Sequence, residues 1–278
     1  MTPLEPEEKP GRHCVSGPVG VFDSGIGGLS VLRTIRQAQP HLDLFYVADT
    51  GYAPYGALEA EKIRQRSRYI TKFLLSHGAE AIVVACNTAT AIAVDSLRSR
   101  FDKPVVGIEP AIKPALQMTS SGRIGILATE ATLNSPRFCN LLSRWRPQAE
   151  VLLQPCPDLV LEVEHGNLRG PRIRSLLSQY IHPLLDKEMD TLVLGCTHYF
   201  FLRPLLREIT GPGVGIPDAS QPVARQLERV LGSELCHPPG KRGSEWFWTS
   251  GEVEFFQEQL SRVWRPGTRA EALPESDP

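Results

Sequence analysis

Two of the six cysteines occur in matching surroundings, and a matched pair of thiols suits acid/base chemistry. Cys86 lies in the segment Ala-Cys-Asn-Thr and Cys196 in Gly-Cys-Thr-His, each directly after a run of apolar residues. A hydrolase would instead need an asymmetric set, one nucleophile with a histidine base and an oxyanion hole. Stereoinversion needs one base to remove a proton and one acid to deliver a proton to the opposite face. The pair therefore predicts inversion at one carbon.

Both thiols are expected at the end of a buried strand and just before a helix. The amides and dipole of a helix N-terminus should lower the thiol pKa from about 8.5 toward neutrality. Small buried apolar roles are expected for the other four cysteines, Cys14, Cys139, Cys156 and Cys236. Because the sequence has no CxxC pair and no cysteine–histidine cluster with ligand spacing, we predict neither a metal site nor a disulfide framework.

A glycine-rich segment, Asp23-Ser-Gly-Ile-Gly-Gly28, follows the first apolar run and precedes a helical stretch. Glycine loops at a helix N-terminus bind anions well, although the same pattern also forms a plain tight turn. The spacing differs from G-x-G-x-x-G, so a dinucleotide site is a poor match. Asp23 favours a functional role, because a carboxylate at a strand end lies at the mouth of a cleft.

Eight short apolar runs rich in Val, Ile and Leu are typical of strands buried on both faces. They are Val19–Phe22, Leu44–Val47, Ala81–Ala85, Val105–Ile108, Ile124–Leu127, Val151–Leu153, Leu192–Leu194 and Val214–Ile216. Helical periodicity marks intervening stretches such as Glu61–His77 and Arg172–Leu185, and a last helix is expected over Glu252–Trp264. Strand and helix alternate, which predicts an α/β fold with mostly parallel sheets.

The eight runs divide into two similar halves, each with a late strand that ends in a cysteine followed by polar residues. We predict two similar α/β domains related by a pseudo-twofold axis, with the active site in the cleft between them. The first domain is expected over residues 19–110 plus 222–264 and the second over 111–221. Disorder is expected for the N-terminal extension, residues 1–18, and for the tail, residues 265–278.

Composition indicates an ordinary globular protein, with 278 residues, a formal net charge of -1 and 41% hydrophobic residues. These values give no sign of a nucleic-acid or membrane surface. The apolar runs are too short for a transmembrane helix, and the acidic, proline-rich start is unlike a signal peptide. We expect a cytoplasmic protein with reduced thiols.

Five motifs in the same order closely resemble those of the bacterial glutamate racemases, over about residues 19 to 260. They are Val-Phe-Asp23-Ser-Gly-Ile-Gly-Gly-Leu-Ser-Val-Leu, Ala-Pro54-Tyr55-Gly56, Val-Val-Ala-Cys86-Asn87-Thr88-Ala, Pro-Val-Val-Gly-Ile-Glu-Pro-Ala-Ile-Lys-Pro-Ala and Leu-Val-Leu-Gly-Cys196-Thr197-His198. The resemblance implies interconversion of L- and D-glutamate, without a cofactor, for peptidoglycan precursors. It also allows a homodimer and activation by a peptidoglycan precursor, which no motif here indicates.

The resemblance implies roles for single residues as well. Cys86 would take the proton from D-glutamate and Cys196 from L-glutamate, with Asp23 assisting the first thiol and His198 the second. The substrate's carboxylates and ammonium would be held by polar side chains and loop amides, at Ser24, Pro54, Tyr55, Gly56, Asn87, Thr88, Thr129, Thr132 and Thr197.

A helper carboxylate is also implied for the second half-site. Glu164 is the preferred residue. Glu162 is the alternative, because the segment that contains both departs from the commoner family pattern.

Two other functions stay open. One is an aspartate or hydantoin racemase, which would use a similar cysteine pair. The other is a non-catalytic, amino-acid-binding regulatory protein, motivated by departures near residues 129–132, 162–165 and 200.

Overall fold

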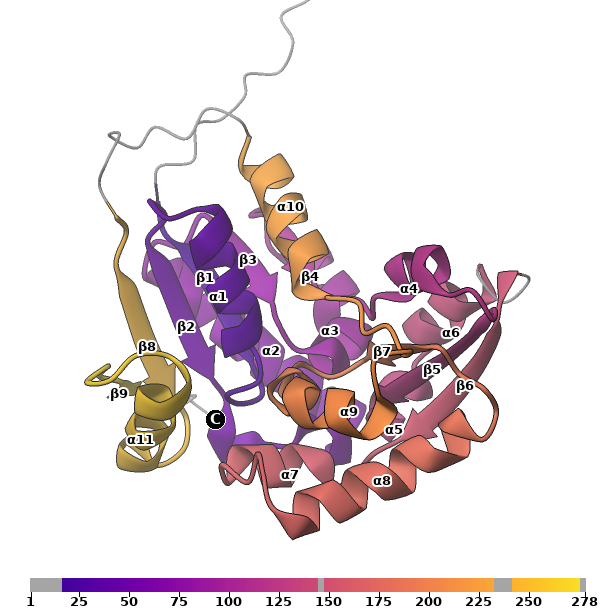
Figure 1. The fold of residues 1–278 in the computed structure, drawn as a ribbon. Coiled ribbons are helices and arrows are strands. Elements are labelled where there is room, and N and C mark those ends of the chain that lie inside the picture. Colours follow the sequence, from indigo (N-terminus) through magenta and orange to yellow (C-terminus); the bar gives the residue numbers. More distant parts are fainter. Residues whose placement is uncertain (1–16, 145–147, 233–241, 276–278) are drawn as a thin grey trace, which may run out of the picture.

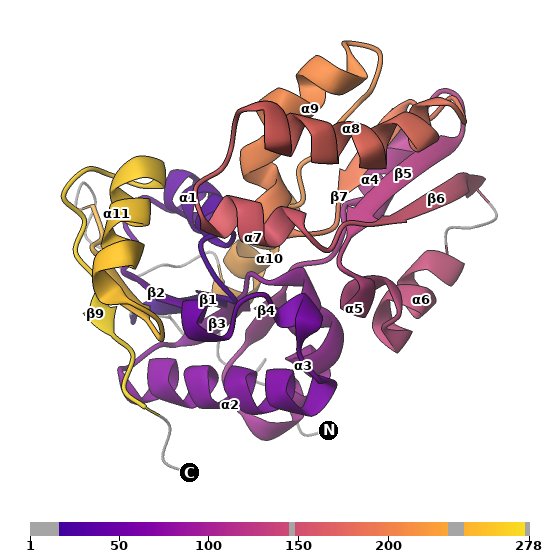
Figure 2. The same ribbon diagram turned by 90° about the horizontal axis from the view of Figure 1, so that it is seen from below.

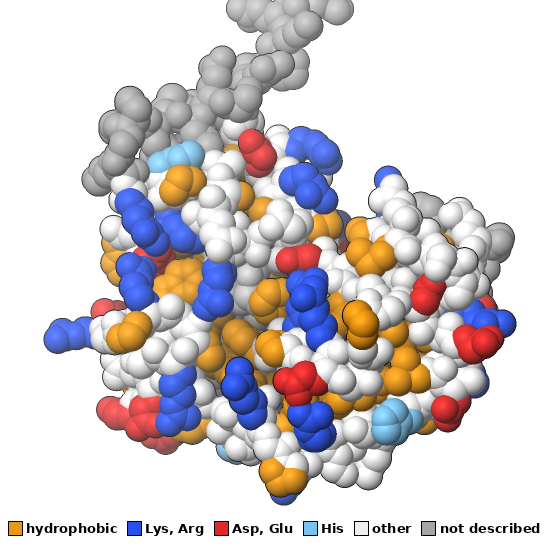
Figure 3. Space-filling view, viewed as in Figure 1, with side chains coloured by type: hydrophobic (Ala, Val, Ile, Leu, Met, Phe, Trp, Pro, Cys, Tyr) orange, Lys and Arg blue, Asp and Glu red, His pale blue; other side chains and the backbone are white. Residues whose placement is uncertain are grey.

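The computed structural model describes residues 17–144, 148–232 and 242–275. Two separate parallel sheets, flanked by helices, form the body of the molecule (Figure 1), which confirms the predicted α/β class. The expected disorder of residues 1–18 concerns a segment that lies, up to residue 16, outside the described part. No helix in the described ranges is long and apolar enough to cross a membrane. Basic and acidic side chains are interspersed over the face seen in Figure 3.

The first sheet has all of its strands parallel. Their order is β4 (Val105–Gly107), β3 (Ala81–Val84), β1 (Val19–Asp23), β2 (Leu44–Ala48), β8 (Glu245–Thr249) and β9 (Glu271–Ala272). Every residue of β1 and β3 is buried, as expected for strands covered on both faces. One face packs against α2 (Ala60–Ser76) and α3 (Asn87–Arg100). The other packs against α1 (Leu29–Ala38), α10 (Ser220–Leu231) and α11 (Val253–Val263) (Figure 2).

The second sheet is smaller, with the parallel order β6 (Glu150–Pro155), β5 (Arg123–Ala128) and β7 (Thr191–Leu194). One face packs against α4 (Ile112–Met118) and α6 (Pro136–Ser143). The other packs against α7 (Leu159–Glu164), α8 (Pro171–Leu185) and α9 (Arg203–Thr210). The apolar cluster on this second face continues into the core beneath α1, so the two halves are packed against each other.

Three expectations about the elements are wrong. Val214–Ile216 is no strand, because it makes only a single bridge from Gly215 to Thr191. The strand β8 was not expected, since its apolar side chains are aromatic (Trp246, Phe247 and Trp248) rather than aliphatic. The tail is ordered over residues 265–275, where β9 pairs with β8 and Leu273 packs into the core. Residues 276–278 lie outside the described part.

The carboxyl ends of the parallel strands position the site. Asp23 ends β1 and Cys86 follows β3, so both lie at one edge of the first sheet. Thr129 and Cys196 occupy the same places in the second sheet, after β5 and β7. A short α5 (Glu130–Leu133) follows Thr129, and a 3-10 helix, η4 (Thr197–Leu202), follows Cys196. The two edges face each other, which brings the ends of four strands together.

Candidate active site

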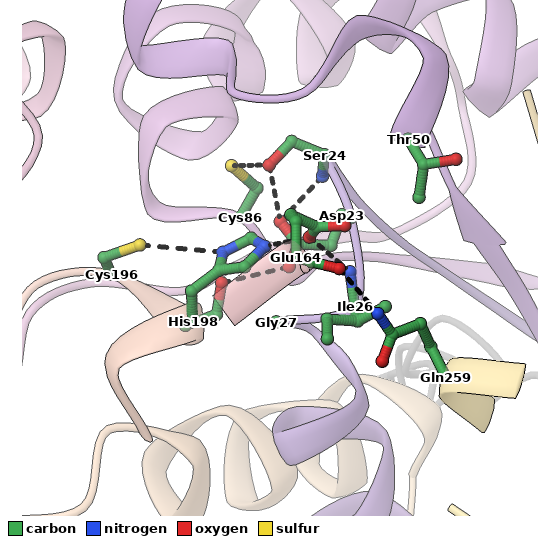
Figure 4. A network of polar contacts seen from close by, with 12 residues as sticks. Asp23, Ser24, Ile26, Gly27, Thr50, Cys86, Glu164, Cys196, His198 and Gln259 are labelled. Atoms are coloured by element: carbon green, nitrogen blue, oxygen red, sulfur yellow. Dashed lines mark hydrogen bonds and ion pairs between the residues drawn. The ribbon is translucent and has the colours of Figure 1, made fainter. Parts of the chain in front are cut away.

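The first thiol is connected to a carboxylate through a hydroxyl group. Cys86 is buried as the N-cap residue of α3, where its Sγ accepts a hydrogen bond from the backbone N–H of Ala89 at 3.4 Å. The thiol donates to Ser24 Oγ at 3.8 Å. Ser24 in turn donates to Asp23 Oδ1, from Oγ at 3.4 Å and from its backbone N–H at 2.7 Å. A hydrogen-bonded chain thus runs from Cys86 to Asp23 (Figure 4).

The second thiol is connected to a carboxylate through an imidazole. The Sγ atom of Cys196 lies 3.7 Å from Nδ1 of His198, on η4. The other ring nitrogen, Nε2, bonds Oε1 of Glu164, at the end of α7. Glu164 is also held by the backbone N–H of Ile26, which donates to Oε1 at 2.9 Å. Each thiol therefore has its own chain to a buried carboxylate, and the two chains share no residue.

The glycine-rich segment lets these two chains approach closely. A Cβ atom on Gly25 would lie 1.8 Å from Oε1 of Glu164, and one on Gly27 would lie 2.5 Å from Nδ1 of His198. In this structure the backbone N–H of Ile26, within the segment, binds the Glu164 carboxylate. The hydroxyl of Thr197 also crosses between the halves and donates to Asp23 Oδ2 at 3.0 Å.

Burial and neighbouring charge shift the pKa values of Cys86 and Asp23. Burial and the Asp23 carboxylate raise the pKa of Cys86 well above its usual range, against the lowering effect of the Ala89 N–H. The expected shift toward neutrality at a helix N-terminus is therefore wrong for Cys86. Burial also raises the pKa of Asp23, although the nearby His198 and hydrogen bonds oppose that shift.

His198 is tuned toward its protonated form. Burial works against the imidazolium, but hydrogen bonds with Cys196 and Glu164, and the charges of those groups, together raise the pKa of His198 well above its usual range. A histidine with a raised pKa beside a sulfur atom can give a proton to that sulfur and take it back. Cys86 thus faces a carboxylate through Ser24, whereas Cys196 faces a cationic ring.

Two of the other four cysteines lie in the described part of the chain. Cys156, directly after β6, is buried in the core as expected. Cys139 of α6 is exposed, so its expected burial is wrong, because the helix turns this position away from the apolar side chains that cover the second sheet. Cys14 and Cys236 lie outside the described residues.

Three threonine hydroxyls close one side of the site. The Oγ1 atom of Thr88, in the first turn of α3, lies 3.0 Å from that of Thr129 and 3.1 Å from that of Thr132. Thr129 and Thr132 are themselves 3.0 Å apart, and Thr129 caps α5 by accepting from the backbone N–H of Thr132. This triangle joins the two sheets beside Cys86. Three of the four threonines expected to bind substrate therefore lie together, and the fourth, Thr197, bonds Asp23 instead.

Asn87 has a buried side chain without a partner. Neither Oδ1 nor Nδ2 makes a hydrogen bond to any residue in the described ranges, and such a group costs about 1–3 kcal/mol when it is left unpaired. Asn87, Cys196 and Thr197 line a cavity of about 20 Å³. A space of that size holds about one water molecule, far less than an amino acid.

The expected loop of Pro54, Tyr55 and Gly56 lies after β2, where Tyr55 begins the 3-10 helix η2 (Tyr55–Ala57). A Cβ on Gly56 would come within 2.9 Å of the Thr129 Cβ, so this loop touches the opposite half. The hydroxyl of Tyr55 donates to Asp49, a residue that the sequence interpretation missed. Asp49 directly follows β2, and Asp23 is the last residue of β1, so the same signal, a carboxylate at a strand end, could have found Asp49.

The structure brings Glu164 to His198 and leaves Glu162 apart. Glu162 accepts from Nδ2 of Asn167, just after α7, at 3.0 Å and pairs with Arg172, in the first turn of α8, at 2.7 Å. Sequence interpretation also missed Gln259 of α11, whose Nε2 donates to the Glu164 carbonyl at 2.6 Å.

In residues 17–144, 148–232 and 242–275, no group of three or more His, Cys, Asp or Glu side chains could hold a metal ion.

Known proteins share this sequence and this arrangement. Residues 27–227 match the family model described as Asp/Glu/Hydantoin racemase. Glutamate racemases from Pseudomonas paraeruginosa and Methylococcus capsulatus are 49% and 48% identical to the chain, over 90% and 92% of its length and 94% and 95% of theirs. The chain belongs to the glutamate racemase family. It is an isomerase that interconverts L- and D-glutamate, and its product D-glutamate serves peptidoglycan synthesis.

Solved structures of glutamate racemases have the same fold. One from Bacillus anthracis superimposes with a TM-score of 0.82 at 29% identity, covering 95% of this chain and 98% of the other. The Escherichia coli enzyme, solved with L-glutamate and the activator UDP-MurNAc-Ala, gives 0.80 at 30% identity, covering 92% and 98%. The alternatives of an aspartate or hydantoin racemase and of a non-catalytic regulator are therefore set aside.

Proposed function

We propose that the two thiols racemise glutamate from opposite faces of its α-carbon. Cys196 takes the α-proton of L-glutamate while Cys86 delivers a proton to the other face, and the roles reverse for D-glutamate. The observation that carries this proposal is the pair of separate hydrogen-bonded chains, Cys86 to Asp23 and Cys196 to Glu164. Each thiol can lose or regain its proton without passing it to the other.

The two hydrogen-bonded chains give each thiol a different partner for proton transfer. Because the pKa of Cys86 is raised, this thiol keeps its proton and can act as the acid in the L-to-D direction. On the other side, His198 exchanges a proton with Cys196, and Glu164 holds the imidazolium in place. Both thiols must stay reduced for this chemistry, so we propose a cytoplasmic location, where cysteines persist as thiols.

Substrate binding and carbanion stabilisation fall to polar groups between the halves. The unpartnered amide of Asn87 and the hydroxyls of Ser24 and Thr88 can bond the carboxylates and ammonium of glutamate. The cavity that Asn87 and Cys196 line is too small for an amino acid, and we propose that the halves separate to admit glutamate and then close again. We propose the expected domains, residues 19–110 with 222–264 and residues 111–221, as the units that move.

Hydrogen exchange with solvent tests the two-thiol mechanism. When protiated L-glutamate reacts in D₂O, the first D-glutamate formed should carry deuterium at Cα, because its proton comes from Cys86 after that thiol has exchanged with solvent. The remaining L-glutamate should stay protiated at early times. Mass spectrometry after chiral separation measures both. Early D-glutamate that retains the original protium would show that one group moves the proton, and would overturn the proposal.

We further propose that a peptidoglycan precursor regulates the enzyme from a second cavity, of about 640 Å³. Four basic side chains line it, from Lys113, Arg144, Arg225 and Arg229. Arginine clusters bind phosphate groups through charge-assisted hydrogen bonds, and the related Escherichia coli enzyme holds UDP-MurNAc-Ala as an activator. The cavity lies between residues 107–117 and 219–229, where the chain passes from one sheet to the other. A ligand there would contact both halves.

Titration with UDP-MurNAc-Ala tests this regulation. We expect the precursor to raise kcat/KM by at least about fivefold, a coupling typical of allosteric ligands. The double variant Arg225→Glu/Arg229→Glu should lose this response, since two charges that face the diphosphate are reversed. The precursor's dissociation constant, measured by calorimetry, provides the direct readout. An unmodified enzyme that neither binds nor responds to the precursor would contradict the proposal.

A further inference from the structure

A fully buried ion pair lies next to the site and is not part of either proton-transfer chain. Asp49 accepts two hydrogen bonds from the Arg66 guanidinium, from Nη2 at 2.7 Å to Oδ1 and from Nε at 3.0 Å to Oδ2. The side chains are 0% and 5% exposed. Asp49 follows β2 at the edge of the sheet, and its backbone N–H donates to the Asp23 carbonyl at 2.9 Å. The pair is therefore fixed to the strand that carries Asp23.

This ion pair holds the loop of residues 50–57 at two further points. The guanidinium of Arg66 lies 4.0 Å from the ring centroid of Tyr52, in the 3-10 helix η1 (Thr50–Tyr52), which is a close cation–π contact. The hydroxyl of Tyr55 donates to Asp49 Oδ2 at 2.5 Å. Because both aromatic residues are bound to one ion pair, the loop between them has little freedom to shift.

The loop fixed in this way reaches the opposite half. Tyr55 packs in the same apolar cluster as Cys86, and Gly56 meets the Thr129 side chain. Thr129 belongs to the hydroxyl triangle with Thr88, which directly follows Asn87. A displacement of the loop would therefore move the side of the site where the carboxylates of glutamate are proposed to bind.

Stability alone gives a weak reason for such a pair. Removing two charges from water costs several kcal/mol per ion, and well-packed apolar residues often replace a buried ion pair with no loss of stability. A planar guanidinium with a bidentate carboxylate does, however, fix geometry more sharply than apolar packing. The pair lies where a short loop from the first half contacts Thr129 of the second half.

We propose that Arg66 and Asp49 are positioning residues. They hold Tyr55 and Gly56 in the position that glutamate binding requires. This inference depends on the proposed role of the loop in binding substrate. L- and D-glutamate have equal free energies, so any variant must change kcat/KM by the same factor in both directions. KM and kcat must therefore be measured separately to distinguish a loss of substrate binding from a loss of proton transfer.

The test removes both charges together. In Asp49→Asn/Arg66→Met neither partner is left as an unpaired buried charge, so we expect a melting temperature near that of the unmodified enzyme. KM for both enantiomers should rise about tenfold or more, and kcat should change much less, because uniform binding is lost rather than proton transfer. Tyr55→Phe removes only the hydroxyl that bonds Asp49, and should raise KM in the same way.

Controls separate positioning from a general loss of structure. Arg68→Met, on the same helix, breaks only an exposed pair with Glu61 and should leave both KM and kcat unchanged. Unchanged KM in Tyr55→Phe overturns the proposal, even if the double variant fails to fold. A fall in kcat at unchanged KM also overturns it. Failure of the two-thiol mechanism would appear instead in the D₂O experiment on the unmodified enzyme.

Discussion

Replacing either thiol should abolish racemisation. We expect Cys86→Ser and Cys196→Ser each to lower kcat/KM by at least about 10³-fold in both directions, since a positioned acid or base contributes about 10²–10⁴-fold and a hydroxyl is a far weaker one. Folding should be preserved, because serine is itself a favourable N-cap residue at the start of α3 and η4. Chiral chromatography of glutamate measures the loss.

The two variants should differ in the enantiomer that they still exchange. Cys196→Ser keeps the thiol that faces the α-proton of D-glutamate, so it should slowly exchange that proton with D₂O without inversion, whereas Cys86→Ser should do so with L-glutamate. Cys139→Ser is the matched control, since this exposed thiol lies outside the site. If either active-site variant kept wild-type turnover, the two-thiol mechanism would be wrong. Exchange with the opposite preference would reverse the assignment of the faces.

The positions of the two cysteines and of Asp23 could be predicted because strands buried on both faces leave a strong mark in a sequence. Continuous Val, Ile and Leu runs located β1, β3, β5 and β7, and parallel strands place their carboxyl ends at one edge. Polar residues directly after such a run must then lie in the site. Asp49 obeys the same rule, and only its partner Arg66, in the middle of α2, carries no comparable signal.

Contacts between the halves could not be predicted, since they depend on tertiary packing. Glu162 and Glu164 are two positions apart on one short helix, and the preference for Glu164 rests on the family resemblance, because their local pattern does not show which one turns toward His198. The pKa of Cys86 was predicted in the wrong direction for a similar reason. A helix N-terminus is visible in the sequence, whereas the burial of Cys86 and its closeness to Asp23 depend on the assembled halves.

Gly27→Ala should disable the enzyme through one added methyl group. The Cβ would lie 2.5 Å from His198 Nδ1, 2.6 Å from Thr197 Oγ1 and 2.7 Å from the His198 backbone nitrogen. The backbone at Gly27 does not have a positive φ, so alanine fits the local conformation and the cost comes from the contact alone. Because backbone as well as side chain stands in the way, η4 must retreat and carry His198 away from its partners.

We therefore expect Gly27→Ala to lower kcat/KM by about 10²-fold or more, the cost of a displacement near 1 Å in a proton-transfer site. Gly213→Ala is the matched control, because its Cβ meets no atom within 4 Å and its activity should match the unmodified enzyme. Kinetics and thermal unfolding of both variants decide the matter. If Gly27→Ala kept activity within threefold, the close approach of His198 to this loop would not be needed for catalysis. The glycine would then serve the turn alone, as its plain interpretation held.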